Sequence, residues 1–345
     1  MTCHKSPSRH SPDSTLLAGD IGGTKVDLVL FKASHGIRNP IIRSRFRSED
    51  HEDFYSVLKL FFQSFPEEYR ISAAAFGVAG PVISSRARIT NLDWEISTSQ
   101  IQTLYSISRV HLVNDLVAIA AAVPSLNDDD LVFINRGEPV PGGAMAVAAP
   151  GTGLGEAFLV WNGSEYIPFP SEGGHTDFAP VNDIQRDLFD FLHEKYGHVS
   201  YERVCSGMGM PDLFAFLHNR DYAECPGSIV ERIESTDDPT PLIIAQAMES
   251  PEPCPLCHEV VNLFVSVLGA EAGNLALKVL ATGGLFLGGG LPPRILPYLT
   301  GGRFMESFLD KGRFSGFLGH VPVAVITHPD APLLGAGQYA LRKPI

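Results

Sequence analysis

Gly19-Asp-Ile-Gly-Gly-Thr24 is the stretch of sequence that decides the fold. It follows the apolar run Leu16-Leu-Ala18 and precedes the alternating segment Lys25-Val-Asp-Leu-Val-Leu-Phe31, so it predicts a strand, a tight glycine turn and a second strand. Paired glycines let the backbone approach a bulky anion and point successive N–H groups at it. Asp20 ends the first strand, where it is placed to hold a hydrated cation, and Thr24 adds a hydroxyl. The turn indicates a site for phosphate and a divalent cation, although a plain hairpin accounts for the same residues.

A second glycine loop strengthens the phosphate interpretation. Ala149-Pro-Gly-Thr-Gly-Leu-Gly155 lies between the apolar strand Ala144–Ala149 and another apolar run, Ala157–Trp161. Neither loop is a P-loop, because no Lys-Ser/Thr pair follows, and neither has the glycine spacing of a dinucleotide fingerprint. Two strand–glycine–strand turns predict two related halves, each supplying one side of a site for a phosphate chain.

Composition narrows the class of protein. The chain has 345 residues, enough for two domains, and 44% of them are hydrophobic. The formal net charge of -13, with no basic cluster, argues against nucleic-acid binding. The most apolar long stretch, Leu275–Leu291, contains Lys278 and several glycines, which is poor composition for a membrane span. We therefore expect a cytoplasmic enzyme that holds anionic ligands through loop amides, a metal ion and a few basic side chains.

The cysteines indicate a reducing compartment. Five are present, and an odd number in a chain of this length does not suggest a disulfide framework. Cys254-Pro-Leu-Cys257-His258 invites comparison with a zinc site, but a second Cys/His pair at suitable spacing is not evident. The favoured alternative is the N-terminus of a helix following closely spaced prolines.

Strand-like and helix-like runs alternate along the chain, which predicts an α/β protein. The polar, Ser/His/Pro-rich residues 1–14 are expected to be a disordered tail. We expect a smaller α/β domain over 15–125, completed by a C-terminal helix within 329–345, and a larger α/β domain over 126–328. The expected strands include Leu16–Asp20, Lys25–Phe31, Ile41–Phe46, Ile71–Val78 and Val110–Val113, and the expected helices include Glu52–Phe65, Ser97–Tyr105, Asn114–Ala122, Asp183–Lys195, Met210–Arg220, Leu256–Leu280 and Ala331–Leu341.

Several polar residues stand where an α/β protein places its chemistry. Asn114 and Asp115 follow an apolar strand and begin a helix, so Asp115 is a candidate general base, although either residue also suits a helix N-cap. Glu172 and His175 flank Gly173-Gly174 in a turn that can aim both polar side chains into a cleft; a metal site there lacks a third nearby ligand. In Ser200-Tyr-Glu-Arg203 the capping box does not close, which leaves Glu202 free to reach a hydroxyl.

Taken together, these motifs resemble bacterial-type glucokinase. The resemblance runs in order from about Leu16 to Leu341 and is carried by Gly19–Thr24, Asn114-Asp115, Gly151-Thr-Gly-Leu-Gly155, Glu172-Gly-Gly-His-Thr-Asp-Phe178, Gly197-His-Val-Ser-Tyr-Glu-Arg-Val204 and Gly273-Asn-Leu-Ala-Leu277. It implies the actin-like ATPase (ribonuclease H-like) fold, two α/β domains facing across a deep cleft. It also implies ATP-dependent phosphorylation of D-glucose to glucose 6-phosphate with Mg²⁺, in a protein that is typically a homodimer.

The resemblance assigns a role to each motif. Asp115 would be the general base, and the substrate-binding residues would be Asn91, Asn114, Asp115, Glu172, His175 and Glu202. Asp20 would hold Mg²⁺, through water because magnesium keeps several waters. The nucleotide would be held by Gly19, Asp20, Ile21, Gly22, Gly23 and Thr24 on one side and by Gly151, Thr152 and Gly153 on the other. Adenosine would lie against Gly288, Gly289 and Gly290, although tight helix–strand packing would also explain those glycines.

Three other functions remain open at this point. A hexokinase or fructokinase of the same architecture would use similar sugar contacts. A phosphohydrolase of this fold would need only water where the sugar lies, yet the predicted cluster is rich in groups that pair with hydroxyls. A non-catalytic sugar sensor would be expected to lack the Asp115 carboxylate or to carry an output domain.

Overall fold

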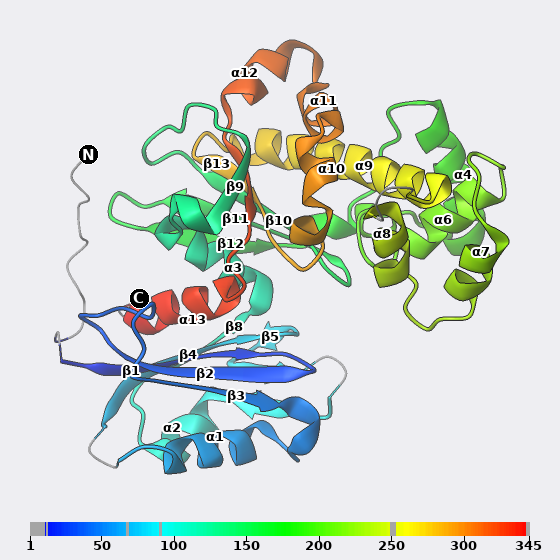
Figure 1. Cartoon of the computed structure of the whole chain (residues 1–345). Coiled ribbons are helices and arrows are strands. Elements are labelled where there is room, and N and C mark those ends of the chain that lie inside the picture. The colour runs from blue at the N-terminus through cyan, green and yellow to red at the C-terminus, as the bar shows by residue number, and fades with distance from the viewer. Residues whose placement is uncertain (1–10, 12, 67–68, 90–91, 249–252, 343–345) are drawn as a thin grey trace. The chain divides into compact units, whose positions relative to one another are not determined.

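The computed structural model of the chain describes residues 11, 13–66, 69–89, 92–248 and 253–342. It separates into two compact units. Unit 1 takes the described residues of Met1–Leu126, Trp161–Pro168 and His328–Ile345, and unit 2 takes Asn127–Val160 and Phe169–Thr327. The tip of the hairpin at Trp161–Pro168, which the sequence analysis placed in the larger domain, clusters with unit 1. Each unit is built around its own sheet (Figure 1).

Unit 1 is built on a five-stranded sheet of order β3-β2-β1-β4-β8. Strands β1 and β2 form the antiparallel hairpin expected around the first glycine turn, while β4 lies parallel to both β1 and β8. A small second sheet has the order β5-β6-β7. The elements of this unit are β1 (Thr15–Ile21), β2 (Lys25–Lys32), β3 (Ile42–Arg47), α1 (Phe54–Gln63), β4 (Ile71–Val78), β5 (Val82–Ile83), β6 (Arg86–Arg88), β7 (Glu95–Ser97), α2 (Thr98–Tyr105), β8 (Val110–Asn114), α3 (Asp115–Ala122) and α13 (Ala331–Leu341), with short 3-10 turns at Ser48–Asp50 and Val123–Ser125.

Side chains of β1 alternate between the two buried faces of this sheet. Leu17 and Ile21 pack with α1 and α2 on one face, whereas Leu16 and Ala18 pack with α3 and α13 on the other (Figure 1). A strand covered on both faces needs apolar residues at every position, which explains the unbroken run at 16–18. The C-terminal helix α13 therefore completes the hydrophobic core of the N-terminal sheet.

Unit 2 carries a six-stranded sheet of order β12-β11-β10-β13-β14-β9. Its core gathers around α9, which is buried along most of its length, with α4, α6 and α8 packed near it. The elements are β9 (Leu131–Asn135), β10 (Met145–Pro150), β11 (Leu154–Trp161), β12 (Tyr166–Ser171), α4 (Asp183–Tyr196), α5 (Tyr201–Val204), α6 (Met210–His218), α7 (Gly227–Glu234), α8 (Thr240–Met248), α9 (Pro255–Val279), β13 (Gly284–Leu287), α10 (Leu296–Thr300), α11 (Arg303–Leu309), α12 (Ser315–His320) and β14 (Val323–Ile326), with 3-10 turns η3 (Asp128–Asp130), η4 (Gly173–His175), η5 (Pro292–Ile295) and η6 (Gly312–Phe314).

The two sheets share one plan, as the paired glycine loops predicted. In unit 1 the hairpin β1–β2 is followed across the sheet by parallel β4 and β8. In unit 2 the hairpin β10–β11 is followed by parallel β13 and β14. Each glycine loop therefore occupies the same position, at the turn of the hairpin that leads its half.

Helix α9 explains two features of the sequence. By length and composition it could cross a membrane, but 78% of its apolar window is buried inside the protein, so it is a core helix. Cys254 is its N-cap residue and Pro255 its first residue, which confirms a helix start there. Among the described residues, no group of three or more His, Cys, Asp or Glu side chains has the geometry of a metal site, and Cys205, Cys225, Cys254 and Cys257 are free thiols.

Candidate active site

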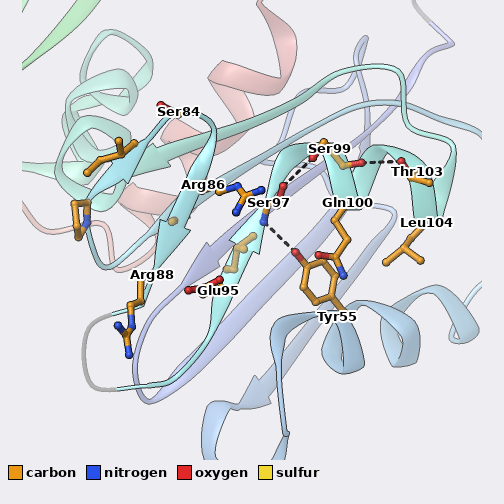
Figure 2. Close-up of a pocket in the computed structure, with 14 residues that line it drawn as sticks. Tyr55, Ser84, Arg86, Arg88, Glu95, Ser97, Ser99, Gln100, Thr103 and Leu104 are labelled. Carbon is orange, nitrogen blue, oxygen red and sulfur yellow. Dashed lines mark hydrogen bonds between the residues drawn. The ribbon is translucent and has the colours of Figure 1, made fainter.

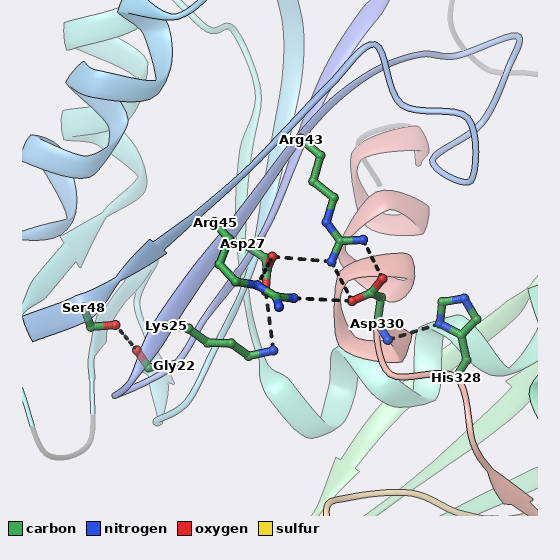
Figure 3. Close-up of polar contacts among 8 residues, drawn as sticks. All are labelled: Gly22, Lys25, Asp27, Arg43, Arg45, Ser48, His328 and Asp330. Atoms are coloured by element: carbon green, nitrogen blue, oxygen red, sulfur yellow. Dashed lines mark hydrogen bonds and ion pairs between the residues drawn. The ribbon is translucent and has the colours of Figure 1, made fainter.

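The first glycine loop is a clamped hairpin turn. The Gly22 N–H donates to the Lys25 carbonyl over 2.9 Å. Ser48 holds the turn from outside, because its Oγ donates to the Gly22 carbonyl at 2.9 Å and its N–H donates to the Thr24 carbonyl at 2.9 Å (Figure 3). Sequence reasoning missed Ser48, which carries no local signal for this role. The clamp presets the shape of the loop before any ligand binds.

Two residues predicted to bind the nucleotide have structural roles in this loop. A Cβ on Gly19 would lie 2.6 Å from the Phe76 ring, so close packing between β1 and β4 requires glycine there. Ile21 is fully buried, and its carbonyl accepts from the Ala79 N–H at 2.9 Å. Neither offers a side chain to a ligand, which leaves Asp20 and the turn Gly22–Thr24 as the candidate groups of this loop.

Asp20 and Asp115 form an acidic pair within unit 1. Burial raises the pKa of Asp20 to about 6; Lys25 opposes the shift, and the negative charge of Asp115 adds to it. Burial also raises the pKa of Asp115, opposed by hydrogen bonds that include the Leu116 N–H at 2.9 Å. A buried carboxylate whose pKa is raised further by a second carboxylate suits the hard oxygen-ligand chemistry of Mg²⁺.

Asn114 is the N-cap residue of α3, a role that the sequence analysis considered for it. Its Oδ1 accepts from the Leu116 N–H at 3.0 Å, and its Nδ2 donates to the Gly80 carbonyl at 3.2 Å. Asp115 is the first residue of α3, at the carboxyl end of β8. The cap orients Asp115 and does not exclude a chemical role for it. Asn91, the remaining predicted sugar contact in this part of the chain, lies outside the described residues.

A network of ion pairs involves β2 and β3, the two strands that follow the first glycine loop. Asp27 is almost completely buried and is paired with Arg45 at 2.9 Å, with Arg43 at 3.4 Å and with Lys25 at 3.4 Å. Arg43 also reaches Asp330 at the start of α13 (Figure 3). This network holds β2, β3 and α13 together and compensates the buried charge of Asp27.

Three of the predicted sugar residues come together in unit 2. His175 lies between two carboxylates, with its Nε2 3.8 Å from Glu172 Oε2 and its Nδ1 3.8 Å from Glu202 Oε1. The exposed fractions of the side chains are 91% for Glu172, 61% for His175 and 21% for Glu202. The cluster therefore presents polar groups to solvent from a base that is partly buried.

Glu202 is not free, which corrects the sequence analysis. Its Oε2 accepts from the Leu154 N–H at 2.9 Å, and a Cβ built on Gly153 would overlap that oxygen. Glu202 thus connects the sugar cluster to the second glycine loop. The capping-box argument considered only neighbours in sequence, whereas the partner of Glu202 comes from a strand 48 residues earlier.

The second glycine loop is fixed through its carbonyls. Those of Gly151 and Thr152 accept from the N–H groups of Gly207 at 2.8 Å and Met208 at 3.1 Å. Within the part of the chain that the structure describes, the N–H groups of Thr152 and Gly153 have no protein acceptor. Two neighbouring N–H groups that have no acceptor among the described residues are suited to bind an anion.

The predicted adenosine glycines differ from one another. Gly289 has φ +81, and a Cβ there would lie 2.6 Å from the Pro150 carbonyl oxygen, while the Gly288 N–H donates to the Ala148 carbonyl at 2.9 Å. Both glycines therefore pack against the end of β10. Gly290 has open space around the position of a Cβ.

A cavity in unit 1 is lined by none of these residues. It has a volume of about 770 Å³ and lies between the small sheet and α2, with Tyr55, Arg86, Glu95 and Leu104 in its lining (Figure 2). The hydroxyl of Tyr55 accepts from the Ser97 N–H at 2.9 Å, which fixes one wall. Size alone does not make this cavity the site of the chemistry.

Comparisons with known proteins decide the family. The glucokinase family model matches residues 17–343. The glucokinase of Nostoc punctiforme is 36% identical over 345 residues, covering 95% of this chain and 99% of the relative. The chain belongs to the glucokinase family.

Solved structures agree with this assignment. The crystal structure of glucokinase from an Antarctic psychrotroph has a TM-score of 0.81 and 31% identity, covering 95% of this chain and 98% of that one. A ROK family glucokinase from Streptomyces griseus, in complex with glucose and AMPPNP, has a TM-score of 0.62 and 16% identity, covering 95% of this chain and 99% of that one, and supports the fold alone. The actin-like sugar-kinase fold predicted from the sequence is confirmed, and the activity is that of a glucokinase, phosphorylation of glucose.

Two buried carboxyl groups near this site lie outside the motifs that resemble those of glucokinases. Glu156 on β11 and Glu271 on α9 are both about 1% exposed, and they lie beneath the turn that carries Glu172 and His175. An apolar pattern with one acidic residue in β11 is the only sequence signal for Glu156. Neither carboxyl was predicted to have a role.

Proposed function

We propose that this glucokinase transfers the terminal phosphoryl group of ATP to O6 of D-glucose, with Asp115 as general base. Such a transfer needs an aligned hydroxyl, an acceptor for its proton, and compensation of the phosphoryl charge. Unit 1 supplies the carboxylate and the Gly22–Thr24 turn. Unit 2 supplies the sugar cluster and the loop Gly151–Gly153.

The observation that carries the proposal is the position of Glu202. It contacts the N–H of Leu154 at the second glycine loop and also approaches His175 in the sugar cluster. A group that binds a hydroxyl is therefore connected to a loop that offers N–H donors to phosphate. A phosphohydrolase would need no such cluster, because water requires no array of carboxylate and imidazole acceptors.

Asp115 suits the role of base by both position and environment. It follows directly after β8, at the end of a parallel strand, where α/β proteins place reactive groups. Burial raises its pKa and so strengthens the carboxylate as a proton acceptor, while the Leu116 N–H opposes that pKa shift and orients the carboxylate. Its proposed step is to accept the proton of the glucose 6-hydroxyl as the oxygen attacks.

Magnesium would be held by Asp20, through water, at the end of β1. The pairing of Asp20 with a second carboxylate fits a divalent cation. When bound, the ion neutralises charge on the transferring phosphoryl group. The Thr24 hydroxyl and the turn amides of unit 1 would bind phosphate oxygens, and so would the Thr152 and Gly153 N–H groups of unit 2.

A coupled assay with a panel of sugars and phosphate donors tests the proposal. We expect glucose with MgATP to give the highest kcat/KM. Comparable values for fructose or mannose would change the assignment to a broader hexokinase, and phosphate release without sugar at a comparable rate would favour a phosphohydrolase. ADP and polyphosphate serve as the alternative donors. A cytoplasmic homodimer, expected from the resemblance, is tested separately by fractionation and analytical ultracentrifugation.

A further inference from the structure

Two buried carboxyl groups lie beneath the sugar cluster in unit 2. Glu156 stands opposite Ala148 on the neighbouring strand, on the sheet face that packs against α9, and Glu271 projects from α9. The negative charge of Glu271 acts directly on the buried carboxyl of Glu156. Two carboxyl groups buried beside one another are stabilised when one of them carries a proton.

The surroundings decide which carboxyl carries the proton. Glu271 Oε1 accepts from Lys278 Nζ at 3.1 Å and its Oε2 accepts from Asn274 Nδ2 at 2.9 Å, so both oxygens of Glu271 already have donors. Glu156 Oε1 is fully buried and has no hydrogen-bond donor among the described residues. The proton therefore belongs on Glu156, where it satisfies an oxygen that would otherwise be unpaired.

This pair contacts both elements that carry the sugar residues. A Cβ on Gly173 would overlap Glu156 Oε2, so the carboxyl supports the backbone of the Gly173–His175 turn directly. On the other side, Asn274 donates to the Tyr201 hydroxyl at 3.0 Å, and Tyr201 immediately precedes Glu202. The Tyr201 N–H in turn donates to the Thr176 carbonyl at 3.0 Å.

We propose that Glu156 and Glu271 share one proton and act as positioning residues, holding the Glu172–His175 turn and Glu202 in the geometry that binds glucose. The inference rests on the proposed function of those three residues as glucose ligands. Loss of the proton would place two negative charges close together in the core. Their repulsion would displace the Gly173–His175 turn, whose backbone contacts Glu156.

Neighbouring charges set the pH at which this occurs. Burial, first, and then Glu271 raise the pKa of Glu156 to about 8, while Lys278 opposes the shift. Tyr201 and Cys205 also face the pair, and burial raises the pKa of both, so neither supplies a charge there. Burial lowers the pKa of Lys311, and the charges of Asp310 and Glu271 oppose that shift. The support is therefore complete near neutral pH and is lost as pH rises through about 8.

The test compares Glu156→Ala and Glu156→Gln with the control Glu194→Gln, an exposed glutamate on α4. We expect Glu156→Ala to raise the glucose KM about tenfold to hundredfold while the ATP KM changes less than about twofold, because small displacements of binding groups have large effects. Glu156→Gln should recover most of that loss, since its amide can donate to Glu271 and cannot ionise. The wild-type glucose KM should rise between about pH 7 and about pH 9, and that of Glu156→Gln should not.

Three results would overturn the proposal: a flat wild-type profile, a glutamine variant as impaired as the alanine variant, or equal losses for both substrates. Amide hydrogen exchange at Ser171–Asp177 without sugar gives a readout that does not depend on glucose. We expect faster exchange there in Glu156→Ala, and unchanged exchange would also overturn the proposal. If the wild type neither binds nor phosphorylates glucose at any pH, the proposed function fails, and the exchange result still decides whether the pair positions the turn.

Discussion

Arg43 and Asp330 form a two-point ion pair between residues 287 positions apart in the chain. Nη1 of Arg43 lies 2.6 Å from Oδ2 of Asp330, and Nη2 lies 2.7 Å from Oδ1. The pair joins β3 to the N-cap of α13, whose apolar face completes the core of the first sheet. Because both hydrogen bonds form at once, the contact fixes the direction as well as the position of the helix.

Arg43→Met should destabilise the protein by about 1–2 kcal/mol at neutral pH, since it removes a bidentate pair that is only partly exposed. Arg43 lowers the pKa of Asp330 below its ordinary value of 3.8, so the stabilisation is present above that value and is lost as pH falls below it. Chemical denaturation at neutral and acid pH should therefore show a difference from wild type that shrinks in acid. Arg47→Met, on the same strand but 73% exposed, is the control, and an equal loss there would contradict the assignment.

Asp115→Asn should lower kcat by about 10²–10⁴ and leave the affinity for glucose largely intact, because the base is lost and the polar contact is kept. Asp183→Asn is a matched control. Asp183 also follows a capping asparagine, Asn182, at the start of a helix, but its side chain is 92% exposed. Steady-state kinetics and calorimetric glucose titration check both variants. Retention of more than about a tenth of kcat would exclude Asp115 as the base.

Glu172→Gln and His175→Ala should raise the KM for glucose about tenfold or more with little change in that for ATP, because each removes a charged or ring partner of a sugar hydroxyl. Since Glu172 is 91% exposed, its replacement should leave the melting temperature unchanged. Kinetics with each substrate varied in turn, together with a thermal melt, check this. An effect on ATP alone would move both residues to the nucleotide site.

Gly153→Ala should raise the KM of both substrates. The new Cβ would overlap Glu202 Oε2, so Glu202 must release the Leu154 N–H and move away from His175. Gly227→Ala, at the start of α7 with open space around its Cβ, is the control. A change confined to ATP would show that Glu202 does not connect the loop to the sugar cluster.

Removal of Mg²⁺ with EDTA should abolish turnover, and added Mg²⁺ should restore it, because charge on the phosphoryl group is then uncompensated. Asp20→Asn should shift the Mg²⁺ titration of kcat to higher concentration without changing glucose affinity. Activity of the wild type in excess EDTA, or an unshifted titration in the variant, would remove Asp20 from the metal site.

Much of the fold could be predicted because it rests on local signals. The hairpin around Gly22-Gly23 follows from apolar strands that flank a glycine pair, and α13 was expected at Ala331–Leu341, where the structure has it. Strands β5, β6, β7, β9, β12 and β14 were not expected. Their conformation is decided by pairing with neighbouring strands in the folded sheets.

The sequence likewise predicted some residues of the candidate site and missed others. Glu172 and His175 share one turn, and their proximity follows from that turn. Glu202 joins them only because α5 packs beside the turn and beside β11. Ser48 was missed because a serine at the end of a strand has many uses, and only tertiary contact shows that it clamps the Gly22 turn.

The sequence by itself determined the two hairpins with their glycine turns, the helix starts at Asn114 and Cys254, and the family. These depend on conformational preferences and hydrogen bonds among residues close together in the chain. Tertiary structure alone decided which charges meet. Arg43 meets Asp330 and Glu156 meets Glu271 because separate elements pack on the two sheets. The physical reason is that the ionisation and pairing of a carboxyl depend on burial and on neighbours brought from distant parts of the chain, which no local pattern encodes.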